Sequence, residues 1–351
     1  MSGKISQRTG EIIDRLMTTE IRTPSYLEVP TLQLYDAARR KIKKPLSYAA
    51  AEGIVNNVQP SDFVLISAGF VLPLWCPRSE TDGPPAAVAL ARTICTALGA
   101  RNVLLTDESV IPVMEAGCAA AGLTQMPLDF LKKTKNAAVA SGVAIESFPI
   151  DDQEAKKKAK KILDKLQPKA IITIERGGPN KKGVYHTGFG NDMSRNSAKL
   201  HHLIDLARSR GIFTAGCLDL GNEIGSGSIK ETVEKVWKYG ATCQCPCGAG
   251  IACVTETDVP VVGSNSAWGA FGVGACISGL TGNLHALHDA DTERRLLIEC
   301  TRAGMRDAAT LAPTLTLSGA HINDYGHLIE LFRAVIKYAF ITPVQPTKLR
   351  D

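Results

Sequence analysis

The stretch DFVLISAGF, residues 62–70, is apolar at nearly every position. A half-exposed strand alternates apolar with polar side chains, whereas a strand buried on both faces does not. The segment that follows, PPAAVALARTICTALGA (84–100), opens with two prolines and has the length and composition of a helix. The pair therefore predicts a buried strand followed by a helix that covers it.

The same pairing recurs along the chain, which predicts an α/β fold with a mainly parallel sheet and helices on both faces, a three-layer, doubly wound arrangement. We expect one α/β domain over residues 1–351, with an N-terminal helical segment (1–55), a βα core (56–280) and C-terminal helices packed on it (281–351). The further pairs are RNVLLTDES with VIPVMEAGCAAAGL (101–123), VAIESFPI with DQEAKKKAKKILDKL (143–166), AIITIER with SAKLHHLIDLARSRG (170–211), FTAGCLDLG with GSIKETVEKVWKYG (213–240), and DVPVVGSN with AWGAFGVGACISGL (258–280).

The overall composition is that of an ordinary globular protein. Of 351 residues, 44% are hydrophobic and 21% charged, and 40 basic against 35 acidic residues give a formal charge of +5. The basic residues are not gathered with aromatic ones, so we expect no nucleic-acid partner. Without a signal peptide or an uninterrupted apolar run of about 18 residues, we expect no membrane association and a cytoplasmic location, or the mitochondrial matrix if the source is eukaryotic.

Ten cysteines are present, and four of them crowd into CQCPCGAGIAC, residues 243–253. Cysteines that are scattered through apolar segments are typical of free thiols in a reducing compartment. The crowded segment has CxCxC spacing rather than the paired CxxC of most metal sites, which favours a turn with packed thiols; metal ligation and a redox-active pair remain alternatives. The histidines show no catalytic spacing, and His186, in a glycine-rich loop, is a minor site candidate.

Polar residues collect where the predicted strands end, which is where open α/β sheets bind their ligands. LDLGNEIGSG (218–227) places Asp219, Asn222 and Glu223 among glycines. Backbone N–H groups of residues 226–229 suit a carboxylate or phosphate, and Ser228 to Glu231 fits a helix-capping box. The pattern is neither GxGxxG nor GxxxxGK[ST], so we expect no nucleotide cofactor. Alternatively, the glycines only turn the chain, and Asn222 and Glu223 hold the loop.

Two further strand ends carry charged groups. In ETDGPP (80–85), Thr81 or Asp82 is placed to cap the next helix, and a ligand-binding role for Asp82 is the alternative. Glu175 and Arg176 end an apolar strand, where they form either a structural ion pair or a site with a carboxylate for proton transfer and a guanidinium for a substrate carboxylate.

Read in order, these motifs resemble one family. VLISAGF, ETDGPPAAVALAR, NVLLTDE, TIERGG, GVYHTGFGNDMS, LDLGNEIGSG, CGAGIACV and SAWGAFGV are similar to the D-glutamate cyclase family, in which this domain forms the C-terminal end of the cyclase or stands free in microbes. The resemblance implies an intracellular hydro-lyase that closes D-glutamate to 5-oxo-D-proline. Carried over by position, it places around the pocket Glu80, Thr81, Asp82, Glu175, Arg176, Asn222, Glu223, Trp268 and Gly269.

This chain departs from the family pattern at the same motifs. Leu218 and Leu220 stand where the family pattern has glycines, and Ala267 stands where an asparagine is usual. These departures indicate a related amino acid or lactam as an alternative substrate.

Lactam closure requires a base for the α-amine, a grip on the α-carboxylate and an acid for the departing oxygen. We assign catalysis to Asp219, Glu223 and Glu175. Substrate binding is assigned to Glu80, Thr81, Asp82, Arg176, Asn222, Gly225, Ser226, Ser228, Ser266, Trp268 and Gly269, with Arg176 and the amides of residues 225–228 as carboxylate anchors. Asp82 and Glu175 hold the ammonium group or share a divalent cation, Mg²⁺ or Mn²⁺, with Asp219.

Other functions remain open at this stage. The alternatives are a racemase, hydrolase or lyase acting on another small amino acid or lactam, and a non-catalytic amino-acid sensor. A small molecule is the only partner expected, apart from further copies of the chain in a homo-oligomer.

Overall fold

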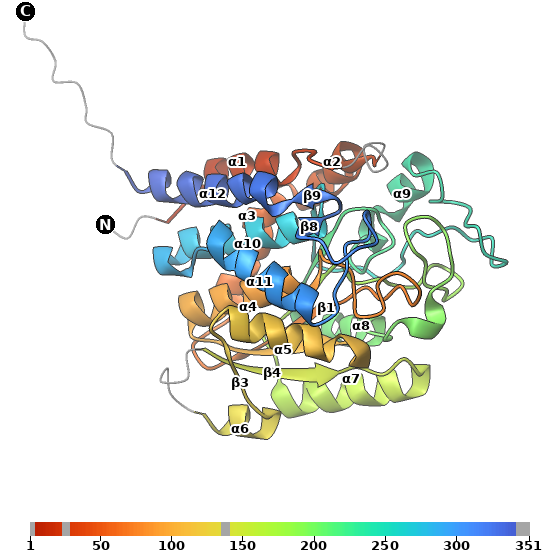
Figure 1. Cartoon of the computed structure of the whole chain (residues 1–351), viewed down its shortest axis with the longest axis horizontal. Coiled ribbons are helices and arrows are strands. Elements are labelled where there is room, and N and C mark those ends of the chain that lie inside the picture. The colour runs from red at the N-terminus through yellow and green to blue at the C-terminus, as the bar shows by residue number, and fades with distance from the viewer. Residues whose placement is uncertain (1–3, 23–28, 135–140, 342–351) are drawn as a thin grey trace, which may run out of the picture.

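The computed structural model describes residues 4–22, 29–134 and 141–341 and contains one large parallel sheet (Figure 1). Its strand order is β3-β4-β2-β1-β5-β6-β7, and every neighbouring pair is parallel. The α/β class predicted from the sequence is therefore confirmed. The strands are β1 (Phe63–Ala68), β2 (Arg101–Thr106), β3 (Thr124–Gln125), β4 (Gly142–Ser147), β5 (Ala170–Ile174), β6 (Phe213–Leu218) and β7 (Val259–Val262).

Alternate side chains of the central strands β1, β2 and β5 enter two separate cores. Phe63 and Leu65 of β1 pack with α7 (Asp152–Leu166), α8 (His201–Ser209) and α6 (Leu128–Lys133) on one face. Val64 and Ile66 join the larger core on the other face, under α4 (Pro84–Leu98), α5 (Ile111–Ala120) and α10 (Ser266–Thr281). Both sides of the central strands β1, β2 and β5 are buried, which explains why these strands read as continuous apolar runs.

The terminal helices cover this side of the sheet. They are α1 (Gln7–Met17), α2 (Thr31–Ile42), α3 (Leu46–Asn57), α11 (Ala290–Arg302) and α12 (Ile322–Ala339). Helices α1, α3 and α12 pack on α10, α11 packs mainly on α5, and α2 packs on β7 and α9 (Lys230–Val236). Helices α1 and α12 lie side by side although they are far apart in the sequence (Figure 1). The buried carboxylate of Asp14 joins α1 to α3 by accepting the N–H groups of Leu46 (2.6 Å) and Ser47 (3.1 Å). In the described residues, no helix is long and apolar enough to cross a membrane.

Two capping predictions were wrong. Helix α9 (Lys230–Val236) follows a 3-10 turn over Gly227–Ile229, so its N-cap is Ile229 and Ser228 does not cap it. The N-cap of α4 is Gly83, which likewise makes no side-chain capping bond. Thr81 and Asp82 therefore do not serve as helix caps.

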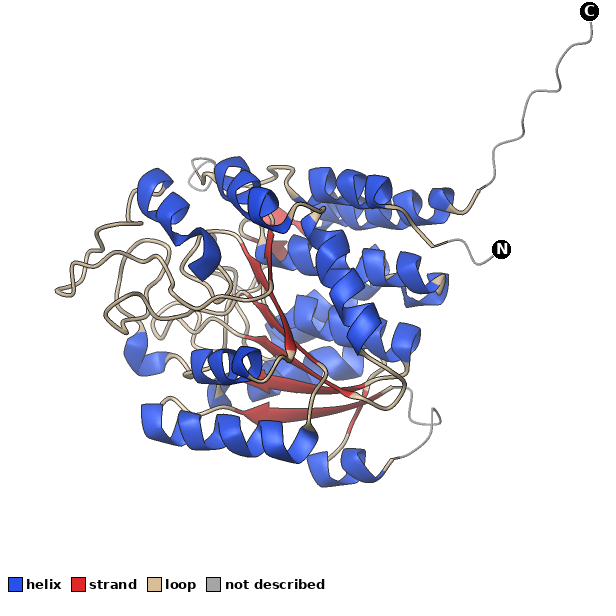
Figure 2. Ribbon diagram, turned by 180° about the vertical axis from the view of Figure 1, so that it is seen from behind, coloured by secondary structure: helices blue, strands red, loops and turns tan. Residues whose placement is uncertain are grey.

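The sheet has a topological switch point between β1 and β5. From β1 the chain moves outward through β2 to the edge strand β3 and its neighbour β4, then returns to add β5 on the other side of β1. The connections leaving the two strands consequently run in opposite directions and leave a crevice at their carboxyl ends. The long loops gather at one end of the sheet (Figure 2).

Candidate active site

A pocket of about 340 Å³ lies among the loops that follow β1, β5 and β6. Four carboxyl groups line it, those of Glu80, Asp82, Glu175 and Asp219, and an apolar wall faces them. The other lining residues are Phe70, Leu72, Trp75, Thr187, Gly188, Phe189, Asn191, Leu220, Asn222, Ala308, Leu311 and Ser318. A wider hollow of about 750 Å³ lies over α6 and α7, but its lysines pair with exposed acids, as Lys165 does with Asp129. The smaller pocket is thus the better candidate, because its polar groups are buried and converge at the switch point.

The four carboxyl groups are too deeply placed to ionise independently. Burial, opposed by the nearby Arg22 guanidinium, raises the pKa of Asp82 to about 7. Burial also raises the pKa values of Glu80, Glu175 and Asp219 well above the usual range, and the charges of the neighbouring carboxylates add to the effect. With a pKa of about 7, the Asp82 carboxyl is present in both protonation states near neutral pH, as acid–base catalysis requires.

Glu175 is held in an unusual backbone conformation directly after β5. Its φ is +44°, a left-handed value that costs a residue with a Cβ about 1–2 kcal/mol. Its carboxylate accepts a hydrogen bond from Ser266 Oγ at the start of α10 (2.5 Å). The strained backbone and this bond together fix the carboxyl group at the pocket.

The first turn of α10 also positions Asp82. Asn265 caps the helix by accepting the N–H of Ala267 (2.9 Å), and its Nδ2 donates to Asp82 Oδ2 (2.7 Å). Ser318 Oγ donates to the same oxygen (3.3 Å), while Asp82 Oδ1 has no hydrogen-bond partner among the described residues. One carboxylate oxygen of Asp82 is therefore left for a ligand.

Of the two predicted catalytic residues in the loop after β6, Asp219 and Glu223, only one faces the pocket. Asp219 lines the pocket, whereas Glu223 is fully buried behind it and accepts the N–H groups of Asp219 (3.3 Å), Leu220 (3.0 Å) and Gly221 (2.7 Å). The Glu223 carboxylate thus stabilises the loop through its own backbone and holds Asp219 in place. Asn222 lines the pocket and donates from Nδ2 to His186 O (2.9 Å).

The amides predicted to bind an anion are already in use. Gly225 N and Gly227 N both donate to Thr255 O, at 2.9 and 3.2 Å, and Ser226 N donates to Glu223 O (3.2 Å). Ser226 Oγ donates to the carbonyls of Gly221 and Glu223. These groups build the loop, and none of them lines the pocket.

Arg176 also faces away from the pocket. Its guanidinium is buried in a two-pronged ion pair with Asp107 and donates to Gly69 O and Ala198 O. Asp107 in turn accepts the N–H of Ala198 (2.7 Å). This arrangement corresponds to the structural ion-pair interpretation of the Glu175-Arg176 dipeptide, with Asp107 rather than Glu175 as the partner.

The remaining predicted binding residues lie around the pocket rather than in it. Thr81 Oγ1 donates to Asp307 Oδ2 (3.3 Å), and the Ser228 hydroxyl has no partner among the described residues. Trp268, on α10, is buried in the hydrophobic core. Gly269 packs closely on β7, since an added Cβ would stand 3.3 Å from Val261. Neither Trp268 nor Gly269 lines the pocket.

Arg22 was not predicted. Its side chain is 1% exposed, and Nη2 lies 3.3 Å from Asp219 Oδ2 while Nε lies 3.4 Å from Glu20 Oε2. No guanidinium nitrogen makes a regular hydrogen bond to the described residues. The residue comes from the N-terminal segment, and no motif marked it in the sequence. It supplies a positive charge beside the acidic pocket.

Comparison with known proteins identifies the family. Residues 29–333 match the family described as D-glutamate cyclase-like, C-terminal. The chain belongs to this family. Over 230 residues it is 29% identical to the Homo sapiens protein "D-glutamate cyclase, mitochondrial", covering 61% of this chain and 32% of that protein. The chain thus spans about a third of the length of this cyclase.

Similarity to a solved structure is much weaker. A short-chain type dehydrogenase/reductase from Mycobacterium ulcerans matches 45% of this chain and 51% of its own, with 12% identity and a TM-score of 0.23. We base no inference on this match. The D-glutamate cyclase-like family membership supports a related function for this chain.

Proposed function

We propose that this chain is a lyase that closes D-glutamate, or a closely related amino acid, to its lactam with loss of water. Four carboxyl groups with raised pKa values around one pocket, in a chain of the D-glutamate cyclase-like family, carry this proposal. In the reaction the α-nitrogen bonds to the γ-carboxyl carbon, a C–O bond of that carboxyl breaks, and the oxygen leaves as water.

The charges around the pocket suggest a division of roles. Asp219 is the base that removes a proton from the α-ammonium group, because the Arg22 guanidinium next to it opposes the rise that burial causes in its pKa and so favours the carboxylate. Glu175 is the protonated acid that delivers a proton to the departing oxygen, with Ser266 occupying its other oxygen. The free Oδ1 of Asp82, together with Glu80, holds the ammonium group before the reaction.

Arg22 replaces Arg176 in our proposal as the anchor for the substrate α-carboxylate. Both guanidinium groups are buried, but that of Arg176 is paired with Asp107, whereas that of Arg22 makes no hydrogen bond to the residues that the structure describes. A guanidinium binds a carboxylate through two parallel hydrogen bonds, which would orient the substrate. Glu223 becomes a positioning residue in this scheme.

The test is proton NMR of purified protein incubated separately with D-glutamate, L-glutamate and 5-oxo-D-proline, without metal and with Mg²⁺ or Mn²⁺. The cations are included because Glu80, Asp82 and Glu175 each offer a carboxylate oxygen, all within 4.8 Å of one another. We expect 5-oxoproline from the D-isomer, loss of activity in Glu175→Gln, and full activity in Glu231→Gln, whose side chain is exposed on α9.

Other outcomes would redirect the proposal. Ligand-dependent thermal stabilisation without product would indicate an amino-acid sensor. No reaction and no stabilisation with either isomer would refute glutamate as the substrate, and Leu220, which lines the pocket in place of a glycine, would direct the search for another.

We also propose a cytoplasmic location. The ten cysteines are all unpaired in the structure, as is typical of proteins in a reducing compartment.

A further inference from the structure

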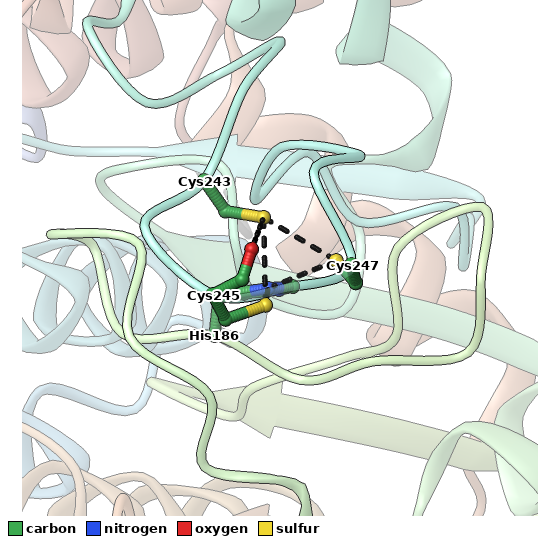
Figure 3. A group of neighbouring side chains, drawn as sticks. All are labelled: His186, Cys243, Cys245 and Cys247. Carbon is green, nitrogen blue, oxygen red and sulfur yellow. Dashed lines mark hydrogen bonds between the residues drawn. The ribbon is translucent and has the colours of Figure 1, made fainter.

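Three cysteines and a histidine from two separate loops meet beside the pocket (Figure 3). His186 lies in the loop between β5 and α8, and Cys243, Cys245 and Cys247 lie in the loop between α9 and β7. Their side chains point toward one another, with His186 Nε2 3.2 Å from Cys245 Sγ and 3.6 Å from Cys247 Sγ. Cys243 Sγ lies 3.5 Å from Cys245 Sγ and 3.3 Å from Cys247 Sγ.

We propose that His186, Cys243, Cys245 and Cys247 bind one Zn²⁺ ion through Nε2 and three thiolates. With Zn–S bonds of about 2.3 Å and a Zn–N bond of about 2.0–2.1 Å, a tetrahedral site separates its sulfurs by about 3.8 Å and sulfur from nitrogen by about 3.6 Å. Four of the six observed separations are 3.2 to 3.6 Å, at or slightly below these values, and all six are within 4.8 Å.

The chain has to fold back sharply to bring these thiols together. In an extended strand, residues 243 and 247 would stand about 13 Å apart, whereas their sulfurs lie 3.3 Å apart here. Gly248, with a φ of +61°, allows the turn, and its N–H donates to Cys245 O (3.2 Å). This turn converts the CxCxC spacing into a three-point ligand set, which the spacing alone did not predict.

His186 is brought to the thiols by contacts between the two loops. Gln244 N donates to Gly190 O (2.9 Å), and Asn180 Nδ2 donates to Gly250 O (2.7 Å) and lies 3.5 Å from Cys247 Sγ. An N–H group directed at a ligating sulfur is the kind of outer contact that supports a thiolate. The two loops are therefore joined around the four ligands by hydrogen bonds of their own.

The loop that carries the cysteines has no regular secondary structure. Residues 237–258 contain turns, bends and a single bridge residue, but no helix or strand. Structureless loops of this length are uncommon in compact domains, and a metal that joins them to a neighbouring segment stabilises them directly. Soft thiolate and imidazole ligands favour Zn²⁺ over Mg²⁺ or Mn²⁺, and four protein ligands leave no open position for catalysis. The ion is structural in this proposal.

The site also connects to the pocket. Residues 187–191 follow His186 directly, and four of them line the pocket. Asn222 holds the His186 carbonyl, and Trp237 Nε1 donates to Gly188 O (2.7 Å). Zinc at His186 would therefore fix one wall of the pocket without touching the substrate.

The first experiment measures zinc bound to the full chain purified in reductant, by inductively coupled plasma mass spectrometry. We expect about one zinc per chain after dialysis, its loss in the double variant Cys243→Ser/Cys247→Ser, and its retention in Cys118→Ala, a buried cysteine on α5. Zinc binding does not depend on turnover, so the result stands whether or not the proposed lyase activity is found.

Cobalt substitution tests the ligand set in protein that has folded. Wild-type protein reconstituted with one equivalent of Co²⁺ should show tetrahedral visible bands and a thiolate-to-metal charge-transfer band. His186→Cys should keep the metal and strengthen the charge-transfer band by about a third, from three thiolates to four.

Two results would overturn the proposal. The first is that wild-type protein in reductant takes up neither Zn²⁺ nor Co²⁺ in stoichiometric amount. This holds equally if the mass of the protein before reduction shows a disulfide between two of these cysteines. The other is the double serine variant retaining a full equivalent of zinc.

Discussion

Asp82→Asn should change how the stability of the protein depends on pH. Burial gives Asp82 a pKa of about 7 in the folded protein, against 3.8 for the free side chain. The folded state therefore holds this proton more tightly than the unfolded chain, and the resulting stability, fully present below pH 3.8, is lost as pH rises through 7. At about 1.4 kcal/mol per pKa unit, the loss amounts to at most about 4 kcal/mol.

Asparagine cannot ionise, so the variant should escape this loss while its amide oxygen still accepts from Asn265. For 351 residues, with an unfolding entropy of about 2.1 cal/mol/K per residue, 4 kcal/mol corresponds to about 5 °C in melting temperature. Melting temperatures are measured by scanning calorimetry at pH 4.5 and pH 8, with a chelator present. The melting temperature of the variant relative to that of wild type should be up to about 5 °C higher at pH 8 than at pH 4.5. Asp36→Asn, on the exposed face of α2, is the control and should follow wild type. If Asp82→Asn also parallels wild type at both pH values, Asp82 does not hold a proton with a raised pKa.

Three other perturbations test separate parts of the site. Arg22→Ala should raise KM for D-glutamate about 10- to 100-fold in steady-state kinetics, because a charged hydrogen bond is worth about 1.5–3 kcal/mol; an unchanged KM would place the anchor elsewhere. Glu223→Gln should lower the melting temperature by about 1–4 °C, because a neutral amide oxygen replaces the carboxylate that accepts three N–H groups, and an unaltered melting curve would contradict that role. Chelation of zinc should lower the melting temperature, and one equivalent of Zn²⁺ should restore it; a curve indifferent to both would argue against a structural ion.

The core of the fold could be predicted because its strands are buried on both faces. The run at residues 62–70 contains β1, and the five other predicted strands of the sheet appear at their expected places. The strand β3 (Thr124–Gln125) was missed because two exposed residues carry no hydrophobic pattern. Helix α9 is shorter than predicted because its first residues form a 3-10 turn that the 3.6-residue period does not distinguish.

The site was harder to predict, because sequence reveals which polar residues follow a strand but not which way they face. Glu175 and Arg176 are adjacent, yet one lines the pocket and the other is buried against Asp107. Asp219 and Glu223 share a loop, but only Asp219 lines the pocket. Arg22 and His186 reach their clusters through tertiary contacts, which no local spacing records.

The carboxyl groups of the pocket and the cluster of His186 with the three cysteines are held by different parts of the fold. Glu175 and Asp219 stand at strand ends and are held directly by α10 and by the 219–223 loop rather than by the ligand segment 243–247. The wall formed by residues 187–191 is held instead through His186 and Trp237. Because this wall lines the pocket but supplies no acid or base in the proposed reaction, loosening it would weaken substrate binding in the ground and transition states alike. Loss of the proposed zinc should consequently act on KM before kcat, whereas loss of either carboxyl should act on kcat itself.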